Sequence, residues 1–398
     1  MVHKLVAAEL RPGMYVVDTG KPWTQSPYLY ATEGELATEQ LSWLLNEGYT
    51  EAYVDLTRSR PGSLPPHLLA MIKSDSPLVE LKDFSPPPPR VSLKEELPKA
   101  QTVFQNSLSL ARDLMTNMRQ GSFDPPAAEP VVEGILESLD RNANALLGLG
   151  KLRQKDDYTY THCVNVSVLS VMFARGLGFS GDGLHAVGMG ALFHDIGKAL
   201  IPLSILNAPR RLNDQEMAAM RKHPLLGWEQ LQRHKGLRPE VLQLTLEHHE
   251  QYAGTGYPFK KAGDAISMPG RIAAIVDVFD ALSSRRVYKD PMPLSKTLST
   301  MYSMRGKEFS PTMLEKFIKL LGVYPVGSAV ELEDGSLSVV SMPNPAKPLQ
   351  PKVILVRDGN NISLGNKERD LSEDGSPGII KTITAKELGI DPATVLGM

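Results

Sequence analysis

The stretch LTLEHHEQYAGTGYPFKKAG, residues 244–263, joins two adjacent histidines to a glycine-rich turn. A predicted helix ends on His248-His249, and Gly254-Thr255-Gly256-Tyr257-Pro258 follows. Neighbouring residues on a helix point about 100° apart, so both imidazoles reach one site only if it is large or holds separate ions. Taken alone, the turn is more simply interpreted as a glycine-rich helix stop.

Other histidines and acids recur upstream and downstream of this stretch. Successive candidates are separated by roughly 25–32 residues, about one helix plus a loop and a return. We therefore expect successive helices of a bundle to contribute one ligand each to a shared core. The candidate metal ligands are His162, His194, Asp195, His223, His248, His249 and Asp277.

These residue types indicate a particular metal chemistry. Imidazole and carboxylate suit iron, manganese, zinc or nickel, and the candidates include no cysteine thiolate. Asp195 and Asp277 each have two oxygens, so either could bridge two ions. Seven ligands exceed one tetrahedral site and suit two octahedral ions about 3.5–4 Å apart, a spacing used in phosphoryl hydrolysis. A lone buried histidine is more often a core residue, and we assign His185 and His234 to the core or the surface.

Three regions follow one another along the chain. Residues 1–84 predict a small α+β domain with strands at 14–18 and 51–56 and a helix at 37–49. A regulatory role is one hypothesis for this domain. Residues 85–95 form a proline-rich linker. Residues 96–322 predict an all-α bundle, and residues 323–398 a β-rich extension with a hairpin turn at 333–335 and a strand at 351–357. The predicted helices span 99–120, 131–152, 161–177, 184–196, 213–221, 239–250, 270–284 and 311–321.

Composition narrows the class of protein. A formal net charge of -2 is not that of a protein that binds polymeric nucleic acid. Cys163 is the single cysteine, so no disulfide can form within the chain, which favours a cytoplasmic location. The start shows no signal peptide, and no apolar run approaches the roughly 20 residues of a transmembrane helix.

Five short motifs stand out between residues 194 and 282: HDIGK at 194–198, KHP at 222–224, HHE at 248–250, GTGYP at 254–258 and RIAAIVDVFDAL at 271–282. Together they resemble those of the HD-GYP phosphodiesterases, a branch of the HD superfamily. The resemblance extends from about Tyr158 to Pro325, and the N-terminal region, with ELRPGMYV, is similar to a domain of unknown function often fused ahead of HD-GYP.

The resemblance implies an HD-type helical bundle and an enzyme that hydrolyses cyclic di-GMP to pGpG, with GMP as a further product left open. It implies two divalent transition-metal ions and attack by a metal-bridging hydroxide. Iron or manganese is the preferred identity for both ions, with nickel or zinc as the alternatives. His162, His194, Asp195 and Asp277 would hold the first ion. Asp195, as the bridge, would hold the second together with His223, His248 and His249.

The same resemblance assigns roles to residues that bind no metal. Lys198, a catalytic candidate with Asp195, and Tyr257 would contact substrate, while Arg286 and Lys289 match positions that contact phosphate. Asp280 could orient a ligand or Lys198. A surface position for Lys198 and a solvated basic face around Arg286 are the alternatives.

Three positions depart from the family pattern. Tyr158 stands where members with a third metal carry glutamate, although Asp156 and Asp157 are nearby, so we predict a binuclear site. Ala253 replaces the aspartate that usually begins the loop, and Arg285 replaces a common acid. Neither of the last two changes removes a metal ligand, but both bear on loop order, rate and recognition of partners.

Two further hypotheses come from other classes. One is a weakly active or inactive sensor that binds cyclic di-GMP, or that binds diguanylate cyclases and other GGDEF-domain proteins through the GYP loop. The other is a hydrolase of a different cyclic dinucleotide or of a deoxynucleoside triphosphate; the GTGYP loop disfavours the triphosphate. Turnover by metal-loaded protein and a substrate panel separate the three.

Overall fold

The structure is a computed structural model in which two units are distinguished, Met1–Val79 and Glu80–Met398. Each unit is described by itself. The structure describes residues 2–18, 34–46, 51–56, 58–65, 68, 89–152, 158–284, 292, 294–344, 347, 349–360 and 362–398.

The first unit contains a four-stranded sheet with the order β1-β4-β2-β3. Its strands are antiparallel where they pair, and the predicted strands at 14–18 and 51–56 correspond to β2 and β4. Leu44 packs with Met14, Val54 and Leu56 in one apolar core. The elements are β1 (Val2–Val6), β2 (Tyr15–Asp18), β3 (Gly34–Glu35), α1 (Thr38–Asn46) and β4 (Glu51–Asp55).

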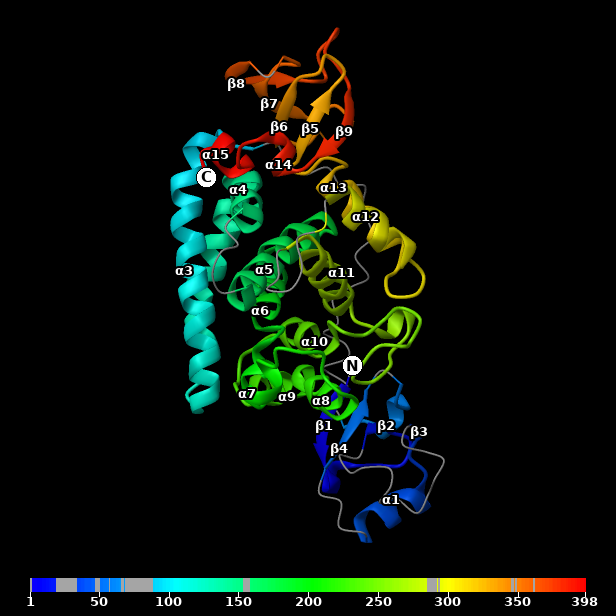
Figure 1. Ribbon diagram of the computed structural model, residues 1–398. Coiled ribbons are helices and arrows are strands. Elements are labelled where there is room, and N and C mark those ends of the chain that lie inside the picture. Colours follow the sequence, from blue (N-terminus) through cyan, green and yellow to red (C-terminus); the bar gives the residue numbers. More distant parts are fainter. Residues whose placement is uncertain are drawn as a thin grey trace. The chain divides into compact units, whose positions relative to one another are not determined.

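The second unit is built around a helical bundle (Figure 1). Its two central helices, α5 and α6, are buried on almost every side, and α5 carries polar as well as apolar residues in this buried position. The main helices are α3 (Leu93–Gln120), α4 (Glu129–Leu152), α5 (Tyr158–Gly176), α6 (Gly181–Phe193), α9 (His223–Leu231), α10 (Pro239–Glu247), α11 (Met268–Ser283), α12 (Leu294–Ser303) and α13 (Pro311–Leu321). The short helices include η5 (Ile196–Leu200), α7 (Leu203–Leu206) and α8 (Asp214–Met220).

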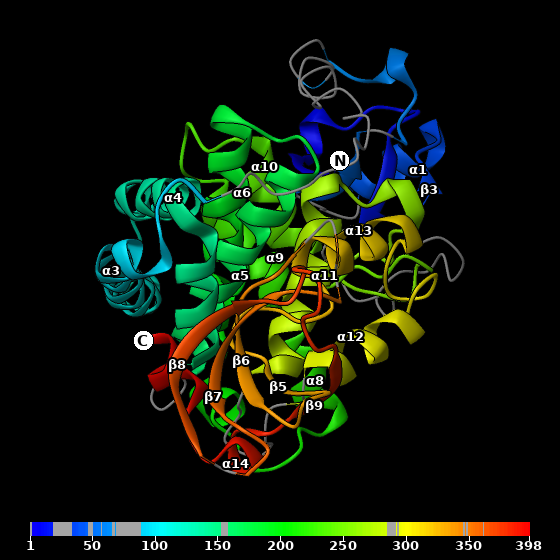
Figure 2. The same cartoon turned by 90° about the horizontal axis from the view of Figure 1, so that it is seen from above.

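Helices α3 and α4 lie side by side, as the view from above shows (Figure 2). Ser92 begins α3 as its N-cap, and its side chain accepts a hydrogen bond from the backbone of Glu95. The two helices are joined by buried Glu96, which accepts hydrogen bonds from Ser138 at 2.7 Å and from Arg141 at 2.7 and 3.0 Å. Helix α3 also packs against α5 and η5, so it belongs to the bundle that holds the histidines.

A five-stranded antiparallel sheet with the order β8-β7-β6-β5-β9 follows the bundle. Alternate residues cover its two faces: Val339 belongs to one apolar cluster and Val340 to the other. The predicted hairpin joins β5 to β6, but β8 and β9 were not predicted. The elements are β5 (Ala329–Leu332), β6 (Leu337–Met342), β7 (Lys352–Arg357), β8 (Ser363–Asp370), β9 (Ile379–Ile383), α14 (Ala385–Leu388) and α15 (Pro392–Leu396).

The predicted fold class is confirmed: the chain is multidomain, and along the sequence a small α+β unit is followed by a helical bundle and then by a β-rich C-terminal segment. Within the described ranges, no helix has both the length and the apolar character needed to cross a bilayer.

Candidate active site in the helical bundle

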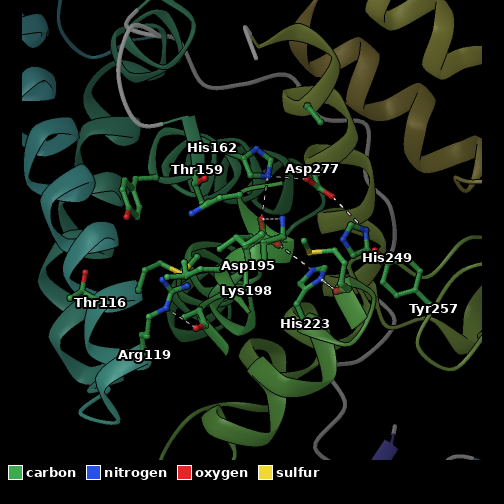
Figure 3. Close-up of a pocket in the computed structure, with 18 of the residues that line it drawn as sticks. Thr116, Arg119, Thr159, His162, Asp195, Lys198, His223, His249, Tyr257 and Asp277 are labelled. Atoms are coloured by element: carbon green, nitrogen blue, oxygen red, sulfur yellow. Dashed lines mark hydrogen bonds and ion pairs between the residues drawn. The ribbon is translucent and has the colours of Figure 1, made fainter. Parts of the chain in front are cut away.

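The predicted metal ligands come from five parts of the bundle and meet beside one pocket (Figure 3). His162 lies on α5 and Asp277 on α11, while His223 begins α9. The remaining members stand at helix ends: His194 and Asp195 between α6 and η5, and His248 and His249 directly after α10.

Two groups of ligand atoms share one carboxylate. The first half-site consists of His162, His194 and Asp195, and the second consists of Asp195, His223, His248 and His249. Within each group, one ligand atom from every residue lies within 4.8 Å of the others.

The two oxygens of Asp195 face different half-sites. Asp195 Oδ2 lies 3.2 Å from His194 Nε2 and 3.8 Å from His162 Nε2. Asp195 Oδ1 lies 3.2 Å from His223 Nε2 and 3.8 Å from His248 Nε2. If cations occupied both half-sites, each could be contacted by a different oxygen of this carboxylate.

Asp277 stands between the half-sites in a similar way. Its Oδ1 lies 3.0 Å from His162 Nε2, and its Oδ2 lies 3.8 Å from His249 Nδ1. The family resemblance implies that Asp277 holds the first ion, and the shorter of these two distances is to His162 of the first half-site.

Three imidazoles are oriented by the backbone of the preceding turn. Nδ1 of His194, His223 and His248 lies 2.7–2.8 Å from the carbonyl oxygen three residues earlier, in Ala191, Met220 and Thr245. Since Nδ1 must donate to a carbonyl, Nε2 of each ring is left as the nitrogen that faces Asp195.

His162 is oriented by a side chain instead. Its Nδ1 lies 2.7 Å from Asp280 Oδ2, and Asp280 Oδ1 accepts hydrogen bonds from Asn165 at 2.9 Å and Ser284 at 3.0 Å. The sequence left open whether Asp280 orients a ligand or Lys198, and the carboxylate bonds to His162. Asn165 was missed, although it lies three residues after His162 and thus on the same side of α5.

The backbone around Asp195 brings η5 against α9. The sequence predicted a helix over 184–196, but α6 ends at Phe193, and Asp195 adopts φ −98° and ψ 4°, outside the helical region. Gly197 then touches α9 so closely that an added Cβ would collide with the carbonyl of His223. The turn at 194–197 therefore brings two predicted ligands, His194 and Asp195, from consecutive positions into the same cluster.

Burial and neighbouring charges set the protonation of the ligands. Burial lowers the pKa of His223 and lowers that of His249 to about 3. Burial and the three neighbouring imidazoles hold the pKa of His248 well below its usual value. These rings are neutral at neutral pH, which is the form that binds a metal ion.

The pKa values of Asp195, Asp277 and His162 are shifted by neighbouring charges and hydrogen bonds. Burial alone would raise the pKa of Asp195, but Lys198 and His194 hold it well below its ordinary value. Burial would lower the pKa of His162, yet the hydrogen bonds to Asp277 and Asp280 outweigh it and raise the pKa to about 10. The same His162 interaction lowers the pKa of Asp277 against the effect of burial.

The donor set fits divalent cations. His194 Nε2 and Asp195 Oδ1 are buried without a hydrogen-bond partner. His223 Nε2 and His248 Nε2, whose other nitrogens face carbonyl oxygens, approach each other to 3.1 Å. Lone pairs that converge in this way are satisfied by cations, and imidazole with carboxylate is a common set for transition metals.

The GTGYP loop turns back on the end of α10. Gly254 has φ +76°, and a Cβ on Gly256 would collide with the backbone of His249 and Gln251. The Tyr257 N–H donates to His249 O at 3.1 Å, and the Tyr257 ring lies 4.7 Å from the His249 ring. The loop thus places Tyr257 against a predicted metal ligand and in the wall of the pocket.

Two buried acids, Glu247 and Glu250, bind the segment that follows this loop. Glu250 accepts backbone hydrogen bonds from Phe259 at 2.7 Å and Lys261 at 2.9 Å. Glu247 accepts from the Lys261 ammonium at 2.7 Å and from the Ser267 backbone at 2.7 Å. The position of Tyr257 therefore depends on contacts with the loop backbone and on Lys261.

A pocket of about 870 Å³ opens beside the ligands, within the range of small-molecule sites. Lys198 lines it and donates to Asp195 Oδ2 at 2.6 Å; burial would lower the pKa of Lys198, but Asp195 raises it. Helix α3 forms part of the wall, which the sequence gave no reason to expect. The lining residues from α3 are Met115, Thr116, Arg119 and Gln120.

Several predicted positions lie elsewhere. Arg286 and Lys289, predicted to contact phosphate, lie outside the described residues, as do Arg285, Asp156 and Asp157. Nothing is described of the side chain of Tyr158. Ala253 is exposed, and its backbone N–H donates to Lys307 O at 2.8 Å, so the missing aspartate leaves this backbone bond in place.

Comparison with known proteins agrees with this geometry. A family model described as an HD domain matches residues 138–313, and one described as a domain of unknown function (DUF3391) matches residues 3–124. The protein named cyclic di-GMP phosphodiesterase PA4108, from Pseudomonas aeruginosa, is 31% identical over 397 residues, which cover 99% of this chain and 93% of the relative.

Two other relatives share a shorter segment. The cyclic di-GMP phosphodiesterase response regulator RpfG, from Xanthomonas campestris pv. campestris, is 33% identical over 56% of this chain and 54% of its own length. A protein from Vibrio cholerae named 3'3'-cGAMP-specific phosphodiesterase 2 is 36% identical over 40% of this chain and 31% of its own length. Since one relative matches almost from end to end, the chain belongs to the HD-GYP family of the HD superfamily.

Proposed function

We propose that this protein is a metal-dependent phosphodiesterase that hydrolyses cyclic di-GMP. The observation that carries the proposal is the single carboxylate of Asp195, whose two oxygens face two separate groups of imidazoles. The names of the relatives support the substrate class, since two of those described above are called cyclic di-GMP phosphodiesterases.

The residues around Asp195 would hold two divalent cations, for which iron or manganese is the preferred identity. Bound there, such ions would supply Lewis acidity at a phosphate and activate water near neutral pH. His194, His223 and His248 are held by carbonyls with Nε2 towards the cluster, and His162 is held by Asp280. Because these side chains are fixed before substrate arrives, little reorganisation is required on binding.

Two side chains are placed to contact substrate. Lys198 keeps its charge beside Asp195 and lines the pocket, so its ammonium group could donate to a phosphate oxygen. Tyr257, stacked on His249, offers an aromatic face and a hydroxyl group at the pocket wall. Arg286 and Lys289 keep the phosphate-binding role that the family resemblance implies.

Hydrolysis of one phosphodiester opens the ring to linear pGpG. The oxygen of water is added to phosphorus, the bond to the ribose 3' oxygen breaks, and a proton ends on that leaving oxygen. A second hydrolysis of pGpG would give GMP, and product identification distinguishes the two endpoints.

The test is turnover by anaerobically purified protein of measured metal content. We expect about two ions per chain and release of pGpG or GMP from cyclic di-GMP, with cyclic di-AMP and 3'3'-cGAMP as comparison substrates. Tight binding of cyclic di-GMP by fully loaded protein without turnover would instead indicate the sensor. Preferred hydrolysis of another dinucleotide would reassign the substrate, and a pull-down with GGDEF-domain proteins tests the predicted partner.

A further inference from the structure

Helix α3 gives the pocket a second wall with a chemistry unlike that of the cluster. We call Met115, Thr116, Arg119 and Gln120 the α3 lobe. In Figure 3, Thr116 and Arg119 lie on one side of Lys198, while His249 and Tyr257 lie on the other. A ligand with one group at the cluster could therefore place another group against α3.

Arg119 is fixed in direction by the bundle. Its Nε donates to the carbonyl oxygen of Ala199 at 3.0 Å, and Ala199 directly follows Lys198 in η5. The guanidinium is planar, so one bond at Nε orients the fork of its two terminal amino groups. Within the part of the chain that the structure describes, Arg119 forms no ion pair, and the acids that line the pocket, Asp195 and Asp277, belong to the ligand cluster.

The rest of the lobe suits a nucleobase better than a phosphate. Thr116 and Gln120 are neutral hydrogen-bonding groups and Met115 is apolar, while Leu203 and Leu206 add aliphatic surface to the same pocket. A phosphate subsite would call for several charged donors, whereas a base needs apolar contact for its faces and a few polar groups for its edge. One guanidinium among such groups matches the second description.

We propose that Arg119 selects guanine, by donating two hydrogen bonds to the O6 and N7 acceptors of one base of cyclic di-GMP. The inference rests on the proposed function and adds a specificity residue to it. Paired donors from arginine to these two atoms are the commonest specific contact to guanine in protein–DNA complexes, and adenine presents an amino donor in place of O6. The side chain would thus favour guanine and disfavour adenine through the same pair of nitrogens.

The experiment compares R119A with wild-type enzyme on three ligands. For cyclic di-GMP we expect kcat/KM to fall by about tenfold or more, as loss of a good bidentate contact implies. The inhibition constant of cyclic di-AMP against the same reaction should stay nearly unchanged or decrease, which would mean equal or tighter binding. Hydrolysis of bis(p-nitrophenyl) phosphate, which has no base, and the bound metal content should stay at wild-type values.

Two further variants make the result specific. K99A removes a positive charge from an exposed position on α3, roughly 30 Å along the helix from Arg119, and should leave every readout unchanged. R119K keeps the charge but loses the planar fork, so it should recover little of the preference for guanine.

Several outcomes would overturn the assignment. Equal weakening of cyclic di-GMP and cyclic di-AMP would indicate a phosphate contact, and lost metal or lost cleavage of the p-nitrophenyl ester would indicate a structural role. Unchanged kcat/KM in R119A, with an active wild type, would refute this inference alone. A wild type that hydrolyses no cyclic dinucleotide would contradict the proposed function instead.

Discussion

The two half-sites differ in how one imidazole is oriented, although each of them also contains a ring held by a backbone carbonyl. In the second half-site, His223 and His248 are held by carbonyls of the preceding turn, which no substitution of a side chain can remove directly. In the first, His162 depends on Asp280, which depends in turn on Asn165 and Ser284. His162 of the first half-site is therefore an imidazole whose orientation can be tuned through side chains outside the predicted ligand set.

Asp195→Ala tests what the half-sites share and should have the largest effect. Because its oxygens face both groups, we expect loss of both ions and a fall in activity of more than about 10³-fold, on the order of losing the activation of water by the metal. Metal analysis and cyclic di-GMP turnover provide the measurement. Retention of two ions with wild-type activity would show that Asp195 is not the bridge.

Lys198→Ala tests the charge that sits beside that bridge. Lys198 donates to Asp195 Oδ2 but comes from outside both groups, so both ions should remain. We expect kcat to fall by about 10²-fold, the size typical of removing one donor that stabilises developing charge. Loss of metal from this variant would mean that Lys198 supports the cluster and not the reaction.

Asp280→Asn should separate the half-sites. An asparagine cannot replace the carboxylate as a charged acceptor for His162, and such outer partners are typically worth 10–100-fold in metal affinity. During dialysis against a chelator, one ion should leave this variant early while the other is retained as in wild type. Loss of both ions at the same rate would contradict the inference that Asp280 supports only one half-site.

Asn165→Ala acts one step further from the metal and should have the smallest effect. It removes a donor to Asp280 Oδ1 but leaves Ser284 bonded to the same oxygen, so we expect less than about tenfold weaker binding of the early ion. Ser283→Ala is the control: Ser283 directly precedes Ser284 on α11, but its hydroxyl donates to the Phe279 carbonyl and not to Asp280. An effect as large as that of Asp280→Asn would place Asn165 nearer the chemistry than we infer.

Much of this architecture was accessible from the sequence because it depends on local signals. The regular spacing of histidines and acids, together with five motifs, predicted the family, and the comparisons confirm it. The strands at 14–18 and 51–56 were found because their apolar residues are bounded by turns. The ligand set itself stays a prediction, supported by the convergence of its members around Asp195.

What the sequence could not supply depends on tertiary packing. Arg119 is separated by 80 positions from the carbonyl that it contacts, and nothing local in α3 marks it as part of a pocket. The end of α6 at Phe193 was missed because the apolar pattern continues beyond it, while the contact of Gly197 with α9 requires a different turn. Arg286 and Lys289 lie outside the described residues, so their predicted contacts stay predictions.

The way in which the GTGYP loop is held has a consequence for how relatives can diverge. The Glu250 carboxylate accepts hydrogen bonds from backbone N–H groups of the loop, while residues 253, 255 and 260 are exposed to solvent. Substitutions at those three positions can alter the outer surface without displacing Tyr257 from His249. Descendants of one ancestral enzyme could in this way acquire different protein partners while keeping the same active centre.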